Sequence, residues 1–254
     1  MQKIAIIGCG SSAMISAHAL LNKGGYDVTV FSEKTADQWY AGPPTGTPFA
    51  AGENIDIERE LGIEHWEDGM FFGDGVMLDF RATRGTEPLT VRGRFHKLGA
   101  AVDLRTRVTR WMNDFEALGG RLVIERVSTE RVDAISQDAD LTLMATGKGD
   151  LGALIPRDDE RSEFDEPQRR LIPSLVKGVR GWGLRSGQLT RPIKFTFFDD
   201  AGEWFFVPFT HKTDGPSYAL NFMVRPGSYL DRFGDAKNCE EFVEIAKATI
   251  VELA

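Results

Sequence analysis

Residues 3–13 read Lys-Ile-Ala-Ile-Ile-Gly-Cys-Gly-Ser-Ser-Ala, and this stretch decides how the N-terminal part of the chain folds. The continuous apolar run at 3–7 predicts a short strand that is buried on both faces. A helix is predicted over 13–23, because apolar residues recur there at three- and four-residue spacing before Gly24-Gly25 ends the pattern. A second β-rich run, Asp-Val-Thr-Val-Phe, follows at 27–31. Strand, glycine turn, helix and strand within about 30 residues predict one βαβ unit.

The glycine turn has the residue types that hold a pyrophosphate group. Gly8 allows the tight turn out of the strand, Gly10 lets phosphates approach the backbone, and the small Ala13 lets helix and strand pack closely. The start of the helix, at Ser11 and Ser12, offers free N–H groups and a partial positive charge to phosphates. The pattern predicts a dinucleotide site, and the alternative is a turn that serves packing only.

The acid expected after the second strand is displaced by one residue. An acid at this place usually binds the ribose hydroxyls of the nucleotide. Here Ser32 follows the strand and Glu33 comes only then. We therefore expect Ser32 and Glu33 to face the ribose together and to bind the nucleotide weakly. The alternative is that Glu33 is a plain surface charge.

The rest of the chain continues the α/β pattern and then changes. Further helices and strands are expected at 102–118, 121–127, 141–145, 192–198, 203–210, 216–225 and 239–253. A hairpin turn is predicted at 199–202, and an irregular loop at 41–52. The charged segment 156–170 separates two parts of different composition. We therefore expect a nucleotide-binding domain at 1–155 and a second domain with an antiparallel sheet at 156–254.

Composition limits the classes of function. The 254 residues include 30 Lys and Arg against 38 Asp and Glu, and the resulting charge of −8 disfavours nucleic acid as a partner. The two cysteines, Cys9 and Cys239, form no disulfide framework and favour the cytoplasm, and no apolar run reaches the length of a membrane span. The four histidines lack metal-ligand spacing, so we expect no metal site and no catalytic side chain. If the protein is an enzyme without catalytic side chains, a bound cofactor carries out the chemical step.

Further motifs follow in an order that resembles one family. Ala-Val-Asp-Leu-Arg at 101–105 opens a helix that ends in Ala-Leu-Gly-Gly at 117–120. Ala-Thr-Gly-Lys stands at 145–148 and Phe-Asp-Glu-Pro-Gln-Arg at 164–169. Together with the glycine turn and Val-Thr-Val-Phe-Ser-Glu at 28–33, these segments make the chain similar to the styrene/indole monooxygenases over essentially its whole length. Members of that family are two-component FAD-dependent epoxidases.

The resemblance implies a fold and a reaction. The fold would be α/β, with a Rossmann-like FAD-binding domain of the hydroxybenzoate-hydroxylase type and an antiparallel β substrate-binding domain. The chain would be the oxygenase component, which receives reduced FAD from a partner NADH:flavin reductase. It would epoxidise or sulfoxidise a small apolar aromatic substrate through a flavin C4a-(hydro)peroxide. The protein would then supply a dry apolar cavity that orients the substrate. Association into a homodimer is a further expectation.

The resemblance also implies which residues bind. The FAD-binding candidates share a place at strand ends or helix starts, and they are Gly8, Gly10, Ser11, Ser12, Ala13, Ser32, Glu33, Arg105, Val127, Thr146 and Gly147. Arg105 would reach the FAD phosphates and the backbone near Val127 the adenine. The substrate candidates are ring-bearing residues of the predicted second-domain strands, Phe195, Phe197, Phe206 and Phe209. The alternative is that these phenylalanines only form core.

Two departures from the family bear on the substrate. Residues 43–48 read Pro-Pro-Thr-Gly-Thr-Pro where the family has polar groups including an Asn, and Gly99-Ala100 stands where Ser and a basic residue are expected. Styrene itself is therefore not the expected substrate. Because the family's chains are longer, the resemblance implies that the C-terminal third is lacking here. Two alternatives stay open: a non-catalytic nucleotide-binding protein, and an NAD(P)-dependent oxidoreductase.

Overall fold

The computed structural model describes residues 1–46, 48–147, 150–179, 189–234 and 236–253. The chain divides into two units. Unit 1 consists of residues 1–68 and 102–162, and unit 2 of residues 69–101 and 163–254. Each unit therefore contains two separate stretches of the chain.

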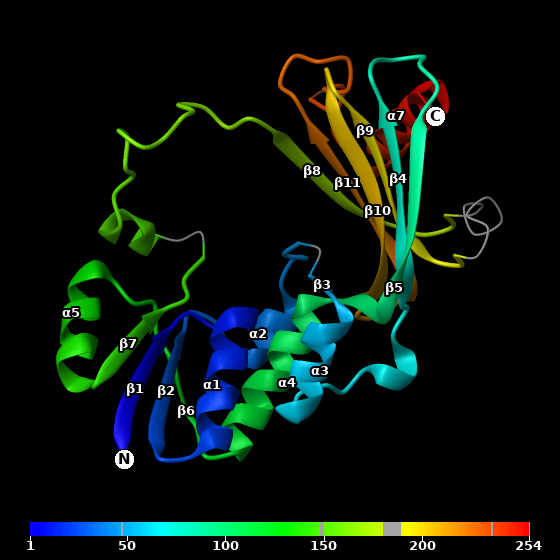
Figure 1. The fold of residues 1–254 in the computed structure, drawn as a ribbon. Helices are drawn as coiled ribbons and strands as arrows, with labels where there is room; N and C mark the ends of the chain where they lie inside the picture. The colour runs from blue at the N-terminus through cyan, green and yellow to red at the C-terminus, as the bar shows by residue number, and fades with distance from the viewer. Residues whose placement is uncertain (47, 148–149, 180–188, 235, 254) are drawn as a thin grey trace. The chain divides into compact units, whose positions relative to one another are not determined.

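Unit 1 is built on a parallel sheet with the strand order β6–β2–β1–β7 (Figure 1). Its strands are β1 (Gln2–Ile7), β2 (Tyr26–Ser32), β6 (Arg121–Ile124) and β7 (Leu141–Met144). β1 pairs with β2 along its whole length and with β7 on its other side. Because the four strands run in the same direction, their carboxyl ends meet at one edge of the sheet.

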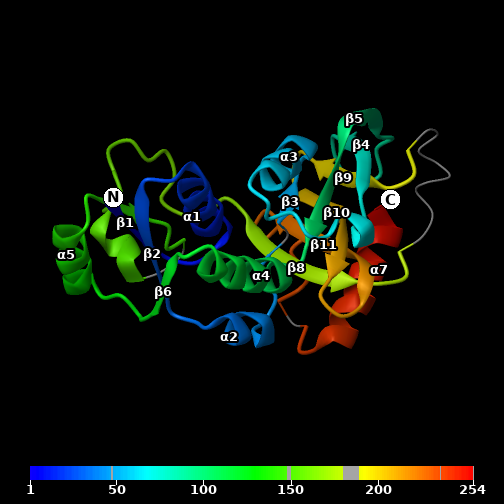
Figure 2. The same ribbon diagram turned by 90° about the horizontal axis from the view of Figure 1, so that it is seen from below.

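Helices cover both faces of this sheet. α1 (Ser11–Lys23) and α4 (Leu104–Ala117) pack on one face, and α5 (Thr129–Asp138) lies on the other (Figure 2). The α1–α4 side contains the largest buried rings of the unit, Trp111 and Phe115, both 0% exposed. The remaining short elements of unit 1 are α2 (Ala36–Ala41), β3 (Phe49–Ala50), α3 (Gly52–Glu60) and the 3-10 helix Asp150–Leu154. A second 3-10 helix, Glu67–Gly69, spans the boundary between the two units.

A buried ion pair joins α3 to α4. The guanidinium of Arg107 pairs with the carboxylate of Glu58, and both side chains are 5% exposed. The same guanidinium lies 4.5 Å from the ring centroid of Trp111. Burial raises the pKa of Glu58, and the charge and hydrogen bond of Arg107 offset only part of that rise. Such a pair is costly to break, because either partner alone would be an uncompensated buried charge.

Unit 2 is built on a mixed sheet in which the order β5–β4–β9–β10–β11–β8 is found. The strands are β4 (Gly73–Arg81), β5 (Leu89–Val102), β8 (Arg170–Val176), β9 (Pro192–Phe198), β10 (Gly202–His211) and β11 (Gly215–Val224). β4 runs parallel to β9, and the pairs β4–β5, β9–β10, β10–β11 and β11–β8 are antiparallel. β5 additionally pairs with β10.

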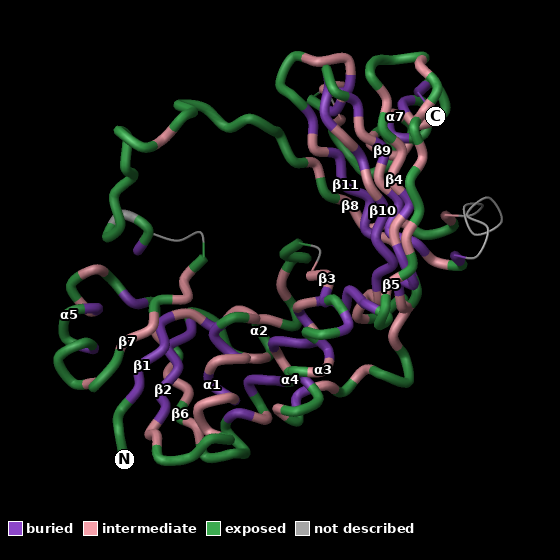
Figure 3. The backbone as a smooth tube through the Cα atoms, in the orientation of Figure 1, coloured by how far each residue is buried: buried purple, intermediate pink, exposed green. Residues whose placement is uncertain are grey.

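The two faces of this sheet differ. Helix α7 (Cys239–Leu253) packs on one face, over a buried cluster that includes Trp204, Phe206 and Phe222. Figure 3 shows this concentration of buried residues along the central strands. On the opposite face the rings of Phe195 and Phe205 stack with centroids 4.8 Å apart, and this ladder of rings continues to Phe197 and Phe80.

The predicted elements are confirmed to within a few residues. The helix predicted over 13–23 is α1, the hairpin at 199–202 joins β9 to β10, and the helix at 239–253 is α7. The sheet of unit 2 is mixed rather than purely antiparallel, because β4 runs parallel to β9. The division expected between residues 155 and 156 differs from the observed units, since residues 69–101 belong to unit 2. Their strands pair with β9 and β10, more than 90 positions further along the chain.

Candidate functional site

A pocket of about 480 Å³ lies at the edge of unit 1 where the parallel strands end. The pocket is lined by residues that follow β1, β2, β6 and β7, which is the usual place of ligand sites in parallel sheets. Seven of the predicted FAD-binding residues line it: Gly8, Gly10, Ser32, Glu33, Val127, Thr146 and Gly147. The structure thus brings together residues that are up to 139 positions apart, from Gly8 to Gly147 (147 − 8 = 139).

The two glycines of the turn have different roles. Gly8 has a φ of 112°, and a Cβ atom built there would lie 2.3 Å from the carbonyl oxygen of Ala145. No side chain fits at this position without moving β7's exit. Gly10 has an ordinary φ of −89°, and a Cβ built there meets no described atom within 4 Å. Gly8 is therefore required by the backbone conformation and the close approach to Ala145, whereas the missing side chain of Gly10 leaves space in the pocket.

The N-terminus of α1 points its free N–H groups to the same place. Gly10 is the N-cap residue, and the first helical hydrogen bond runs from Met14 N to Gly10 O at 3.0 Å. The amides of Ser11, Ser12 and Ala13 precede it and have no partner within the helix. Among the described residues, no side chain caps this helix and no acid stands in its first turn. An anion bound there would accept hydrogen bonds from these free N–H groups and would be stabilised by the positive end of the helix dipole.

Ser32 and Glu33 are placed differently. Ser32 is 2% exposed, and its hydroxyl donates to Lys34 O at 2.7 Å and accepts from Lys34 N at 3.2 Å. The Glu33 carboxylate is 64% exposed and lies 3.8 Å from Arg126 Nε. Ser32 shapes the turn, and Glu33 is the group that can reach a ligand in the pocket.

Arg105 is buried and engaged by its own helix cap. Its backbone N–H, Nε and Nη2 donate to the carboxylate of Asp103 at 3.0, 2.9 and 2.6 Å, and Nη1 donates to Gly42 O at 3.4 Å. The hydrogen bond with Asp103 raises the pKa of Arg105. Arg105 does not line the pocket. Its charge is balanced by Asp103, and its side chain fastens the end of α2 to the start of α4.

Several lining residues were not predicted. Lys34, Glu125 and Arg126 are sequence neighbours of predicted residues, so the strand ends could have indicated them. Trp39 and Leu151, two of the apolar residues that line the pocket, carried no sequence signal. Cys9 also lines the pocket, and burial raises the pKa of its thiol to about 11, so the thiol stays protonated near neutral pH. Lys148 of the Ala-Thr-Gly-Lys motif lies outside the described residues.

The four predicted substrate phenylalanines do not share one face. Phe195 and Phe197 are half-buried and stack on the face opposite to α7. Phe206 is 5% exposed and belongs to the cluster under α7, on the other face of the sheet from Phe195. Phe206 pairs with Lys194 in the β9–β10 register, whereas Phe205 pairs with Phe195. By strand alternation Phe209 lies on the same face of β10 as Phe205, but it is 1% exposed and belongs to the buried core.

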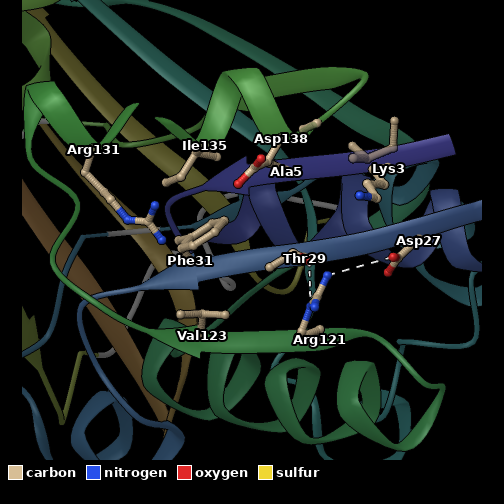
Figure 4. Close-up of a pocket in the computed structure, with 12 residues that line it drawn as sticks. Lys3, Ala5, Asp27, Thr29, Phe31, Arg121, Val123, Arg131, Ile135 and Asp138 are labelled. Atoms are coloured by element: carbon tan, nitrogen blue, oxygen red, sulfur yellow. Dashed lines mark hydrogen bonds and ion pairs between the residues drawn. The ribbon is translucent and has the colours of Figure 1, made fainter. Parts of the chain in front are cut away.

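A second cavity, of about 250 Å³, lies on the face of the unit 1 sheet that bears α5 (Figure 4). Its polar lining comes from Lys3, Asp27, Thr29 and Arg121 on the strands and from Arg131 and Asp138 on α5. Arg121 donates to Thr29 Oγ1 at 3.0 Å and lies 3.8 Å from Asp27, so these groups are paired with one another. This cavity is separate from the pocket at the glycine turn.

The described residues contain no group of three or more His, Cys, Asp or Glu arranged to hold a metal ion. Within the same part of the chain, no helix combines the length and apolar character that crossing a membrane requires.

The α/β fold is similar to that of several flavin-dependent enzymes of known structure. Over 97% of this chain and 61% of the other, the flavin-dependent brominase Bmp2 superposes with a TM-score of 0.67 at 12% identity. The flavin-dependent halogenase CmlS gives 0.63 at 16% identity over 100% of this chain and 46% of that chain. 2-Methyl-3-hydroxypyridine-5-carboxylic acid oxygenase gives 0.61 at 15% identity, covering 100% and 66%. The predicted fold class is confirmed.

Comparison of the sequence shows similarity to styrene monooxygenases. Residues 147–254 match the family described as "Styrene monooxygenase A putative substrate binding domain". The chain is 28% identical over 238 residues to styrene monooxygenase StyA of Pseudomonas fluorescens and 27% identical to that of Pseudomonas sp. Each alignment covers 93% of this chain and 54% of the relative, so the chain spans about half the length of the curated relatives it matches. The predicted resemblance to styrene monooxygenases is confirmed.

Proposed function

We propose that this chain is the FAD-binding and substrate-binding part of an FAD-dependent monooxygenase of the styrene monooxygenase type. The observation that carries the proposal is the open helix N-terminus at Gly10, in a chain that is similar to styrene monooxygenases over 93% of its length. The unpaired amides, the space at Gly10 and an exposed acid after β2 form the donor and acceptor set that a dinucleotide requires.

The residues of the pocket fit FAD in three parts. The pyrophosphate would lie at the amides of Ser11 and Ser12, where the helix dipole favours negative charge. The ribose hydroxyls would donate to the Glu33 carboxylate, and the adenine would lie against the backbone near Val127. Thr146 and Gly147, at the exit of β7, would pack beside the cofactor. In this proposal Arg105 holds the loop at Gly42 in place rather than contacting the phosphates.

When bound in its reduced form, FAD supplies the activation of O₂ and the transfer of one oxygen atom to the substrate. This chain's own residues bind the cofactor, exclude water and orient the substrate. For substrate contact, unit 2 offers the stacked rings of Phe195 and Phe197. Apolar rings of this kind bind an aromatic substrate by contact area and keep its surroundings dry.

We further propose that reduced FAD comes from a separate NADH:flavin reductase and leaves again after turnover. The wide exposure of Glu33 supports this, since an acid that is 64% exposed gives the ribose only a weak, water-screened contact. A cofactor held this way exchanges readily with solution. A small aromatic compound with an alkene or a sulfide is the proposed substrate.

The experiment is a titration of the purified chain with oxidised FAD and with dithionite-reduced FAD, read by flavin fluorescence and by thermal shift. We expect both forms to bind, and the reduced form to bind more tightly. NAD(P) serves as the matched control, and we expect no stabilisation by it. Failure of FAD to bind in either redox state, or a preference for NAD(P), would contradict the proposal.

A further inference from the structure

A second group of side chains in unit 2 is arranged around Asp74, where β4 and β9 begin. Asp74 is 6% exposed, and its carboxylate accepts hydrogen bonds from Thr190 N (2.6 Å), Thr190 Oγ1 (2.8 Å) and Arg191 N (3.0 Å). Burial alone would raise the pKa of Asp74, but these hydrogen bonds together lower it. Asp74 therefore stays ionised, and its oxygens are used to fix the backbone of residues 190 and 191.

Among the described residues, the side chain of Arg191 has no hydrogen-bond or ion-pair partner. Its guanidinium lies 5.2 Å from the ring centroid of Phe71, and its Nε is buried without a hydrogen-bond acceptor. No carboxylate of the described residues forms an ion pair with it, whereas Arg170 and Arg232 in the same unit pair with Asp231 and Glu252. A half-buried guanidinium on an aromatic ring retains its capacity for a forked contact with an anion.

Tyr218 adds a donor beside this cation. Its ring meets the edge of Phe71 with centroids 5.3 Å apart, and its hydroxyl has no hydrogen-bond partner among the described residues. Burial raises the pKa of Tyr218, against the opposing influence of Arg191, so the hydroxyl keeps its proton at neutral pH. Phe71 is itself fixed, because its backbone N–H donates to Thr210 Oγ1 at 2.9 Å.

We propose that Arg191, Tyr218 and Phe71 form a binding site for an aromatic carboxylate. The guanidinium would donate to the carboxylate oxygens, the Tyr218 hydroxyl would donate a further hydrogen bond, and the ligand's ring would pack against Phe71. Charge-assisted hydrogen bonds of this kind are stronger than neutral ones, and the fork of Arg matches the two oxygens of a carboxylate. A hydrocarbon such as styrene would leave these donors unused.

The site has a consequence for the substrate class. If the oxygenase activity proposed above is correct, then the site makes an aromatic acid with an alkene or sulfide a better substrate than the corresponding hydrocarbon. That consequence rests on the proposed function. Binding of the carboxylate itself does not, since it requires only the side chains of unit 2.

The test uses three related probes and no flavin. 4-Vinylbenzoate, its methyl ester and styrene are titrated separately into the purified 254-residue chain, and binding is followed by calorimetry and by saturation-transfer NMR. The variants are Arg191→Gln, Arg191→Lys and Tyr218→Phe. Arg92→Gln, which changes an exposed arginine on β5 of the same unit, is the matched control. Thermal unfolding of each variant checks that it is folded.

We expect 4-vinylbenzoate to bind the unaltered chain at least about tenfold more tightly than the ester or styrene, because only the carboxylate can form charge-assisted hydrogen bonds with Arg191. Arg191→Gln should remove this preference, Arg191→Lys should retain part of it, Tyr218→Phe should weaken it by a few fold, and Arg92→Gln should leave it intact. Equal binding of acid and ester, or an unchanged preference in a folded Arg191→Gln variant, would overturn the proposal. So would absence of 4-vinylbenzoate binding. Because no flavin is present, these outcomes are independent of the FAD titration.

Discussion

Gly8→Ala and Gly10→Ala add the same methyl group to the same turn, two residues apart, and should have opposite consequences. At Gly8 the φ of 112° is unfavourable for alanine by about 1–2 kcal/mol. The new Cβ would also lie 2.3 Å from Ala145 O, and relieving such an overlap costs about 1–3 kcal/mol. The sum, about 2–5 kcal/mol, corresponds to a fall in Tm of about 5–15 °C for a chain of this size.

At Gly10 the balance is different. The φ of −89° suits alanine, the methyl group meets no described atom within 4 Å, and the loss of glycine's freedom in the unfolded chain is favourable by about 0.4–1 kcal/mol. Alanine is a poorer N-cap than glycine, which offsets this gain. The net change in stability should therefore stay within about 1 kcal/mol. The methyl group would, however, occupy the space that the phosphates of a bound nucleotide need.

Thermal unfolding and FAD titration of both variants check the pair. We expect Gly8→Ala to lower Tm, and Gly10→Ala to keep Tm while weakening FAD binding by about tenfold or more, the size of effect of losing one charge-assisted hydrogen bond. A Gly10→Ala variant that binds FAD like the unaltered chain would refute the placement of the phosphates at this helix. A Gly8→Ala variant of unchanged Tm would refute the assignment of Gly8 to the fold.

Three further predictions concern side chains of both units. Glu33→Gln should weaken FAD binding by a few fold in fluorescence titration without lowering Tm, because the carboxylate is 64% exposed; an unchanged affinity would remove Glu33 from the site. Glu58→Ala should lower the free energy of unfolding in urea by about 3–5 kcal/mol, because it leaves Arg107 buried and unpaired, whereas replacing both residues by apolar ones should cost much less. Equal losses in the two would argue against this ion-pair explanation. Burial, together with the hydrogen bond to Asp200, raises the pKa of Tyr229 from 10.0 to about 12. The folded chain then keeps a proton that the unfolded chain releases, so stability should fall as pH rises from about 10 to about 12, and Tyr229→Phe should lessen this fall in urea titrations at each pH.

The glycine turn after β1 could be located from the sequence because its signals are local. The strand at 3–7, the glycine spacing and the helix after Gly10 lie within one βαβ unit, where each residue restricts its neighbours. Strand β9 and its hairpin were predictable for the same reason, because alternation and turn chemistry act over few residues. What alternation could not indicate is which face α7 would cover, and so whether Phe206 or Phe205 would lie on the same face as Phe195.

Two of the strands that the sequence did not reveal, β4 and β5, depend on long-range pairing. β4 and β5 carry glycines and charged residues at positions where an apolar alternation would have marked a strand, and they are stabilised by partners far along the chain. The family resemblance implies that Arg105, at a helix start, reaches the phosphates. In the structure the Arg105 guanidinium pairs with the carboxylate of Asp103, two residues earlier. Sequence spacing alone does not indicate whether an arginine binds a neighbouring carboxylate or a ligand.

The interleaving of the two units limits how the chain can be divided and how it can be built up. Residues 69–101 belong to unit 2, although they precede α4, β6, α5 and β7 of unit 1 in the chain. Strand β4 in this segment pairs with β9, which is synthesised about a hundred residues later. During synthesis, unit 1 can close around 1–68 and 102–162 while β4 and β5, which pair with each other, still lack β9 and β10. A fragment cut at residue 155 would carry β4 and β5 without their sheet, and residues 156–254 alone would expose the edge of β9. Each half would lack strand partners that the other half supplies, so each site is best studied in the whole chain.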